Sequence, residues 1–232
     1  MHPLIEVCVE GTAGALIAIA AGADRLELNA NLALDGLTPA FEDLVAVRQL
    51  TKIPIIAMLR PHANSFVYDR ATQLLMLRDL ERLLVCGADG VAVGSLTLAG
   101  EIDVSLMSDL RRNSANRILV MHRAFDRLDE PAIGLEQLID LGIDRVLTSG
   151  GARTAEIGLE QLRRLVIQSR GRIEILPGAG IRPGNALAIL RATGCDQLHG
   201  TFKQELPGCI LPDPQAITAL KQLRICSDSA EK

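Results

Sequence analysis

The sequence predicts one TIM barrel, the (β/α)8 fold, that covers residues 1–232 as a single domain. Eight short aliphatic runs alternate with eight helix-length amphipathic segments, which is the pattern of repeated βα units. Dividing 232 residues by eight units gives 29 per unit, enough for one strand, one helix and two short loops. A Gly-x-Asp element also recurs at about every second unit. These observations favour a compact barrel, a little shorter than the ~250 residues typical of the fold.

Strands are predicted where aliphatic or β-branched residues form runs bounded by Gly, Pro, Asn or Asp. In chain order these runs are 4–9, 25–29, 54–59, 90–94, 117–122, 145–149, 172–177 and 197–200. The amphipathic segments that predict helices are 12–21, 39–50, 70–85, 103–113, 131–141, 154–169, 184–192 and 214–225. A doubly wound Rossmann sheet is the main alternative. It would need a GxGxxG turn after the first strand, and residues 9–14 read VEGTAG.

The Gly-x-Asp element precedes the second, fourth, sixth and eighth predicted strands. Its four aspartates are Asp24, Asp89, Asp144 and Asp196. A glycine in the left-handed conformation ends each helix, and the aspartate after it can accept local backbone N–H groups. We therefore predict a structural role for these aspartates at the amino-terminal face of the barrel, where conserved chemistry is not expected.

Composition excludes several classes of protein. The 24 basic and 28 acidic residues give a net charge of −4, and no Lys/Arg run exceeds a pair, so a nucleic-acid partner is not expected. The amino terminus lacks the pattern of a signal peptide, and the apolar stretches are too short to span a membrane, which predicts a cytoplasmic protein. The five cysteines are dispersed, and no CxxC pair indicates a disulfide framework or a zinc knuckle.

Polar residues gather at predicted strand ends, where barrel enzymes hold their catalytic groups. The candidate catalytic residues are Glu6, Glu27, Arg60, His122, Arg123 and His199. Two interpretations stay open. Glu6, Glu27, Arg60 and Arg123 can form an internal ion-pair network, or the whole set can line a ligand pocket. In the second case Glu6 or Glu27 is the general base, His122 or His199 is the acid, and the two arginines bind an anion.

Glycine-rich loops follow the last three predicted strands and suggest an anion site. Its candidate residues are Ser149, Gly150, Gly178, Gly180 and Gly200. Glycines let backbone N–H groups approach a phosphate closely, and barrels often bind phosphate in the loops after strands seven and eight.

Cys8 also has two interpretations. It is either a buried thiol that fills space or a soft metal ligand, because it shares the interior side of the first strand with Glu6. The other cysteines, Cys86, Cys195, Cys209 and Cys226, are interpreted as packing residues. Four of the five aromatic residues, namely Phe66, Tyr68, Phe125 and Phe202, follow strands and are expected to form walls of the pocket.

Many of these segments, in order, resemble the CutC family. They include IEVCV (5–9), GADRLEL (22–28), GLTP (36–39), MLRP (58–61), GADG (87–90), GEID (100–103), HRAFD (122–126), RVLTSGG (145–151), PGAG (177–180) and HG (199–200). The resemblance implies a TIM barrel, a cytoplasmic homodimer, and a role in copper homeostasis through Cu(I) binding. It places one copper cysteine at Cys8. A second family cysteine corresponds to Asn29 here, and the basic RPRGGD segment of the family is RPHANS in residues 60–65.

Three functional possibilities from different classes follow. The first is copper homeostasis, with Cu(I) bound at Cys8. The second is a TIM-barrel enzyme of unknown reaction that acts on a small anionic or phosphorylated substrate at the carboxyl ends of the strands. A scaffold with no chemistry of its own is the third and least specified possibility.

Overall fold

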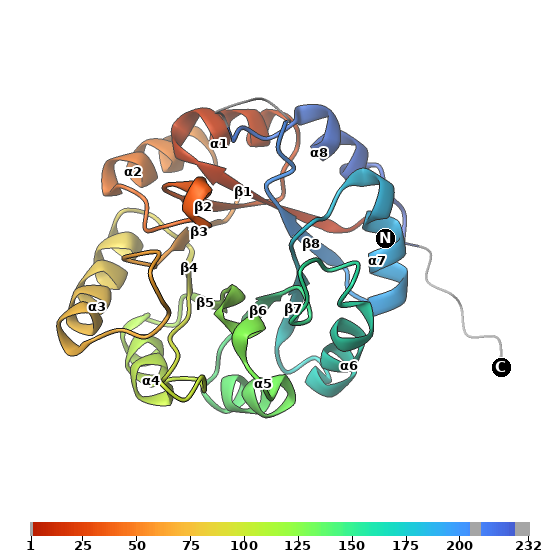
Figure 1. Ribbon diagram of the computed structural model, residues 1–232. Coiled ribbons are helices and arrows are strands. Elements are labelled where there is room, and N and C mark those ends of the chain that lie inside the picture. The colour runs from red at the N-terminus through yellow and green to blue at the C-terminus, as the bar shows by residue number, and fades with distance from the viewer. Residues whose placement is uncertain (1, 205–209, 226–232) are drawn as a thin grey trace.

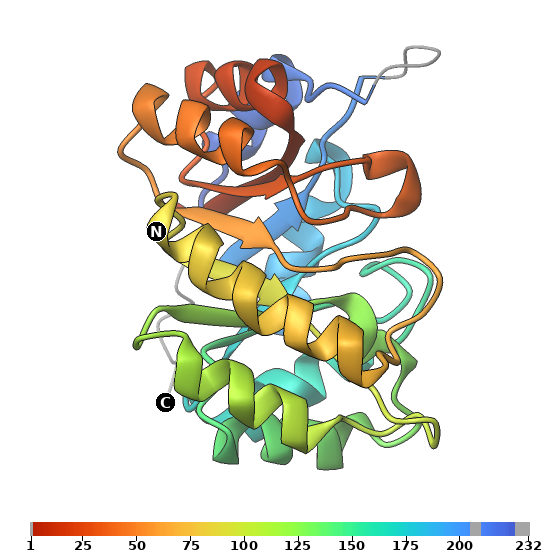
Figure 2. The same cartoon turned by 90° about the vertical axis from the view of Figure 1, so that its left-hand side faces the viewer.

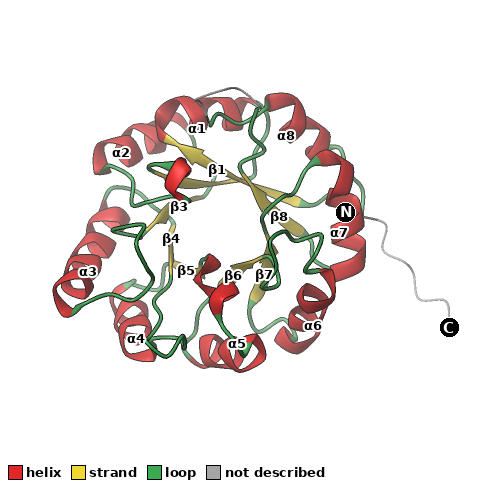
Figure 3. Cartoon of the chain, viewed as in Figure 1, coloured by secondary structure: helices red, strands yellow, loops and turns green. Residues whose placement is uncertain are grey.

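A computed structural model of the chain describes residues 2–204 and 210–225. Eight parallel strands form a barrel inside a ring of eight helices (Figures 1 and 3). The strands are β1 (Leu4–Glu10), β2 (Arg25–Asn29), β3 (Ile55–Met58), β4 (Gly90–Val93), β5 (Ile118–Met121), β6 (Arg145–Thr148), β7 (Glu174–Pro177) and β8 (Gln197–Gly200). The helices are α1 (Gly11–Ala20), α2 (Phe41–Leu50), α3 (Arg70–Val85), α4 (Val104–Asn113), α5 (Pro131–Asp140), α6 (Leu159–Ser169), α7 (Pro183–Thr193) and α8 (Pro214–Lys221). The predicted TIM barrel is confirmed.

Hydrogen bonds connect the strands in the order β7-β6-β5-β4-β3-β2-β1-β8. The two end strands, β7 and β8, lie next to each other and bring the sheet close to full closure (Figure 1). All strands run toward the same side of the barrel, and the loops on that side include two short 3-10 helices, η1 (Leu32–Leu34) and η2 (Arg123–Arg127) (Figure 2). Within the described residues, no helix has both the length and the apolar character needed to cross a membrane.

Strand alternation divides the core into two layers. Residues such as Val7 and Leu26 point outward and pack against the helices. A smaller apolar cluster fills the barrel interior, and its members are Ile56, Met58, Ala92, Val120, Leu147 and Leu176. Polar residues of β1, β2 and β8 share this interior side, and so do Arg145 of β6 and Glu174 of β7, so the inner layer combines apolar and polar side chains.

The Gly-x-Asp element has the predicted structural role in three of its four copies. A carboxylate oxygen of each aspartate accepts the backbone N–H of the preceding strand, in the pairs Asp24–Ile5 (2.7 Å), Asp89–Ile55 (2.8 Å) and Asp144–Leu119 (2.8 Å). The fourth, Asp196, makes no such side-chain bond to a described residue. Its preceding strand is β7, which forms no ladder with β8, so no amide of that strand is held beside the carboxylate.

Two helix boundaries differ from the prediction by four residues or more, whereas the other helix ends lie within two residues of it. α6 begins at Leu159 rather than at residue 154, because residues 149–158 form a tight loop in which Gly158 meets the carbonyl of Ser149. A Cβ on Gly158 would lie 1.9 Å from that oxygen, so the loop requires glycine there. α8 ends at Lys221, four residues before the predicted end. Cys209 and Cys226 lie outside the described residues, whereas Cys195 is buried and Cys86 is half-buried.

Candidate functional site

A cavity of about 1150 Å³ opens at the carboxyl ends of the strands. Its charged lining residues are Glu27, Asp35, Arg60, Arg123, Asp126, Arg127, Arg153, Arg182, Lys203 and Asp213. Basic side chains outnumber acidic ones in this set, although the whole chain carries a net negative charge. The charged part of the cavity lining therefore has a formal excess of positive charge.

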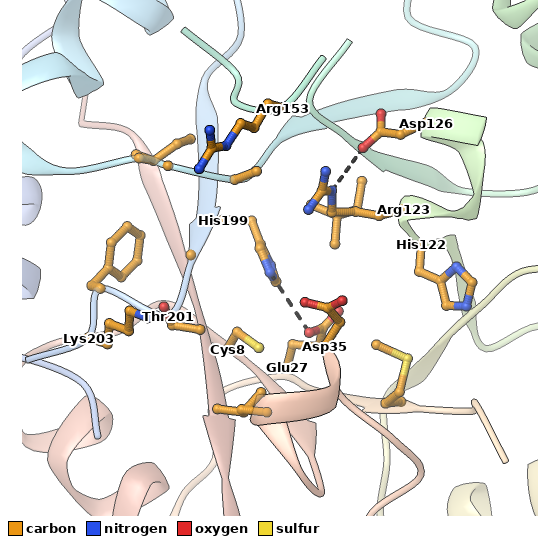
Figure 4. A pocket seen from close by; sticks show the side chains of 18 of the residues that line it. Cys8, Glu27, Asp35, His122, Arg123, Asp126, Arg153, His199, Thr201 and Lys203 are labelled. Carbon is orange, nitrogen blue, oxygen red and sulfur yellow. Dashed lines mark hydrogen bonds and ion pairs between the residues drawn. The ribbon is translucent and has the colours of Figure 1, made fainter. Parts of the chain in front are cut away.

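Three potential metal ligands lie together on the floor of the cavity. The Sγ atom of Cys8, a carboxylate oxygen of Glu27 and an imidazole nitrogen of His199 all lie within 4.8 Å of one another. The His199 Nε2 atom is 3.9 Å from Glu27 Oε2 (Figure 4). Strand pairing brings them together, because Cys8 is aligned with Glu27 across β1 and β2, and β8 pairs with the other edge of β1. All three residues are buried.

Glu6 lies behind His199 and fixes the orientation of its ring. Glu6 Oε1 is 2.7 Å from His199 Nδ1, and Glu6 Oε2 accepts a hydrogen bond from Arg25 Nε. Burial by itself would raise the pKa of Glu6, but Arg25 and His199 outweigh it and lower that pKa to about 2. Because Glu6 is ionised, Nδ1 carries the proton that is donated to it. The lone pair of Nε2 then faces Glu27 and the cavity when the ring is neutral.

The interior ion pairs use different arginines from those predicted. Arg25 pairs with Glu6, and Arg145 donates to Glu174 Oε2 at 2.6 Å. Gln197 connects the two pairs, since it accepts from Arg25 (2.9 Å) and donates to Glu174 (3.2 Å). The alternative in which Glu6 and Glu27 pair with Arg60 and Arg123 is therefore wrong, since Arg123 pairs with Asp126 and Arg60 donates to backbone carbonyls. Arg25 was not singled out from the sequence, although it lies on the same side of β2 as Glu27 and this alternation could have pointed to it.

The Cys8 thiol is protonated in the absence of a metal ion. Burial and the carboxylate of Glu27 raise its pKa well above the ordinary value. Asn29 Nδ2 donates to Cys8 Sγ at 3.2 Å and to Glu27 Oε2 at 3.0 Å, so this amide holds both groups in place. Burial lowers the pKa of His199, but Glu27 and Glu6 more than compensate and raise it. A bound metal cation would displace the thiol proton of Cys8 and the proton on His199 Nε2.

The donor set fits a copper ion. Thiolate and imidazole are both ordinary copper ligands, and the Glu27 carboxylate adds an oxygen ligand that suits divalent ions. Asn29, at the position of the second family cysteine, directs its NH2 group toward Cys8. It therefore supports the thiol and is not a ligand to a metal in this orientation.

Two of the predicted catalytic residues, Arg60 and His122, shape the wall of the cavity. Arg60 donates from Nη1 to the carbonyls of Leu34 (2.9 Å) and Gly36 (3.0 Å), which anchors the η1 loop. His122 Nδ1 accepts the N–H of Ala124 at 3.2 Å, so its proton is on Nε2. Burial, assisted by the charge of Arg60, lowers the pKa of His122 to about 3. His122 is thus neutral near pH 7 and cannot supply a proton as an imidazolium.

Asp126 organises the loop after β6, and the sequence reasoning did not single it out. Its carboxylate accepts from Thr148 Oγ1 (2.5 Å), Ser149 N (3.0 Å), Ser149 Oγ (2.9 Å) and Gly151 N (3.1 Å). It also pairs with Arg123 Nε at 2.8 Å, which turns that guanidinium toward the cavity (Figure 4). The HRAFD segment contained the signal, since an acid follows the basic pair at the end of the fifth strand.

The predicted anion-site residues therefore divide into two groups. The amides of Ser149 and Gly151 already bind the internal carboxylate of Asp126, and Gly150 N donates to Thr148 Oγ1 at 2.9 Å. Gly178 N donates to the carbonyl of Thr148 at 3.0 Å. In contrast, Gly180 and Gly200 line the cavity, and the Gly180 N–H has no acceptor among the described residues.

The expectation that four aromatic residues line the pocket is half correct. Phe66 and Phe202 line the cavity. Tyr68 and Phe125 are buried in the outer core layer instead, between strands and helices. The position after a strand does not show whether a side chain points into the cavity or into the outer core layer.

The CutC family model matches residues 3–204. A family protein CutC of Histophilus somni (strain 2336) is 42% identical over 203 residues, which is 86% of this chain and 84% of that protein. The corresponding protein of Caulobacter vibrioides (strain NA1000 / CB15N) is 40% identical over 92% of this chain and 85% of its own length.

Solved structures agree with this result. The CutC protein of Streptococcus agalactiae, which is named for copper homeostasis, superposes with a TM-score of 0.82 at 30% identity, over 86% of this chain and 98% of that one. An aldolase structure, QR15, has a TM-score of 0.67 at 13% identity over 94% and 91% of the two chains, and at that identity it shows the fold alone.

Proposed function

Since the chain belongs to the CutC family, we propose that it binds a copper ion at the mouth of the barrel and serves copper homeostasis. Cys8, Glu27 and His199 hold the ion. The observation that carries this proposal is the convergence of a sulfur, an oxygen and a nitrogen donor within 4.8 Å on the floor of the cavity. Copper is the cargo of the protein in this proposal.

The surroundings of the three donors support the assignment. A metal-ligating histidine usually donates its other ring N–H to a carboxylate, and Glu6 occupies that position at 2.7 Å from His199 Nδ1. The Asn29 side-chain amide restrains the other two donors, because it donates hydrogen bonds to Cys8 Sγ and Glu27 Oε2. Such partners keep ligands oriented before the ion arrives, which lowers the cost of binding.

Anaerobic competition with a chromogenic Cu(I) chelator tests the proposal. We expect about one Cu(I) per chain in the wild type and a large loss of affinity in Cys8→Ser and His199→Gln. Cys195→Ser is the matched control, because Cys195 is also buried but precedes β8 on the opposite face of the barrel. Equal affinity in Cys8→Ser and the wild type would refute the site.

A second function is favoured by the size and charge of the cavity. A volume of about 1150 Å³ is much larger than an ion requires, and it is typical of pockets that hold small molecules. In this alternative an anionic substrate lies between Glu27 as general base and His199 as general acid, with Arg123 binding the anion. A thermal-shift screen of phosphorylated metabolites and small carboxylates tests it. The absence of stabilisation by every anion would count against it.

The family connection also leads us to propose a cytoplasmic homodimer. Sedimentation equilibrium measures the oligomeric state directly, and a monomer over the micromolar range would refute the dimer. Subcellular fractionation tests the location.

A further inference from the structure

An ion held by Cys8, Glu27 and His199 would have protein ligands on one side only. Cys8, Glu27 and His199 come from β1, β2 and β8, which are neighbours in the sheet and form a single wall of the barrel. In the described residues this is the one group of three or more Cys, His, Asp or Glu donors that lie close together. A divalent ion such as Zn²⁺ takes four ligands in most protein sites, and sites with three protein ligands leave the fourth position to water or substrate.

The open side faces the cavity and its basic residues. Arg123 is held in position by Asp126 at 2.8 Å and by Ser149 Oγ at 3.3 Å. Arg153 is exposed, lines the cavity, and makes no hydrogen bond or ion pair with any described residue. Figure 4 shows both guanidinium groups on the same side of the cavity as the His199 ring, above Glu27 and Cys8. The Arg123 guanidinium is therefore held in place before an anion binds, and the Arg153 guanidinium has no counter-ion among the described residues.

We infer that the metal site and the cavity form one composite site. A small anion that carries a carboxylate or phosphate group binds with one oxygen on the bound divalent ion, and Arg153 and Arg123 bind its other oxygens. This inference rests on the proposed metal binding at Cys8, Glu27 and His199. In the composite site the ion is also part of the anion-binding site. The anion and the ion bind together, so each raises the affinity of the protein for the other.

The donor chemistry supports such a ternary complex. Thiolate and carboxylate groups offset the charge of a divalent ion, so a further anion in the cavity needs cations of its own. Guanidinium groups supply them, since their planar N–H pairs match the geometry of carboxylate and phosphate oxygens. The Gly180 N–H, which lines the same cavity without an acceptor among the described residues, offers an additional donor.

Cobalt substitution tests the inference spectroscopically. The full chain is loaded with Co²⁺, and inorganic phosphate or malonate is titrated while the visible d–d absorption is recorded. We expect a saturable change in the spectrum, because an oxygen of the anion enters the ligand sphere. The two titrations also identify which anion chemistry the cavity prefers. Arg153→Gln should raise the Kd for the anion at least about tenfold and leave the Co²⁺ affinity that is measured without anion unchanged. Arg164→Gln is the matched control, since Arg164 lies on α6 in an exposed pair with Glu160.

The outcomes separate the two proposals. A cobalt spectrum that neither phosphate nor malonate alters overturns the composite site and leaves the metal site intact. An anion affinity that is equal in the presence and absence of Co²⁺ also overturns it, because the ion would then take no part in anion binding. Failure of the chain to bind Co²⁺, Zn²⁺ and Cu(I) overturns both proposals.

Discussion

Removal of the Asp126 carboxylate should destabilise the protein strongly, although Asp126 lies in a loop. Its side chain is 6% exposed and accepts hydrogen bonds from four donor groups of residues 148–151. Thr148 and Ser149 are fully buried, so the Thr148 hydroxyl and the Ser149 amide would lose their acceptor without gaining water. An unsatisfied buried donor costs about 1–3 kcal/mol. The exposed Arg123 adds little. We expect Asp126→Ala to lower the free energy of unfolding by about 3–5 kcal/mol, and Asp126→Asn by about half as much, because the amide retains one acceptor oxygen.

Urea unfolding followed by far-UV circular dichroism measures this loss. The chain has no Trp and one Tyr, so intrinsic fluorescence is a poor probe. For a protein of this size the expected change corresponds to a fall in Tm of roughly 10 °C. Asp129→Asn is the matched control, since Asp129 is exposed and its side chain has no partner among the described residues. A loss below about 0.5 kcal/mol in Asp126→Ala, the range of an ordinary surface substitution, would refute the assigned role.

Three further predictions concern the interior, the opposite face and the metal site. Glu6→Gln should cost the metal-free protein about 3 kcal/mol near pH 7, because Arg25 loses its buried partner. The folded pKa of Glu6 is about 2 against an ordinary 4.5, so its stabilisation is complete above pH 4.5 and disappears as the pH falls toward 2. The difference in unfolding free energy between the wild type and Glu6→Gln should therefore shrink across that range, and a constant difference would contradict the ionised carboxylate. Asp89→Asn should destabilise the protein by about 1–2 kcal/mol, because it weakens the bonds of the carboxylate to the Ile55 amide and to Arg48. Asp196→Asn is the control and should be neutral. Equal effects of the two substitutions in urea unfolding would show that the carboxylate bonds are unimportant. Asn29→Cys should raise the Cu(I) affinity of the reduced protein at least about tenfold, because the new thiol lies beside Cys8. Asn29→Ser is the control and should not raise this affinity. Equal affinities of the two variants in chelator competition would exclude a second Cu(I) ligand at position 29.

The sequence predicts where the candidate site lies more accurately than it predicts which side chains of the site pair with one another. Glu27, Cys8 and His199 were all identified as strand residues of the barrel interior, and they do line one cavity. His122 and Arg60 also line it, but the Ala124 amide and the η1 carbonyls already occupy their inner polar groups. Local sequence cannot show this, because those contacts depend on how each loop turns after its strand.

The sequence by itself determined the barrel, its eight repeated units and the end of the barrel where the polar residues lie. These features follow from hydrophobic periodicity and from the position of a residue within its strand, which are properties of neighbouring residues along the chain. Only the tertiary structure decided that Arg25 neutralises Glu6, that Glu6 orients His199, and that Asp126 binds the loop after β6. Glu6 and His199 are 193 residues apart in sequence, and the register of β1 against β8 brings them together. That register is selected by the packing of the whole barrel, because a shift of one residue would exchange the inner and outer faces of a strand.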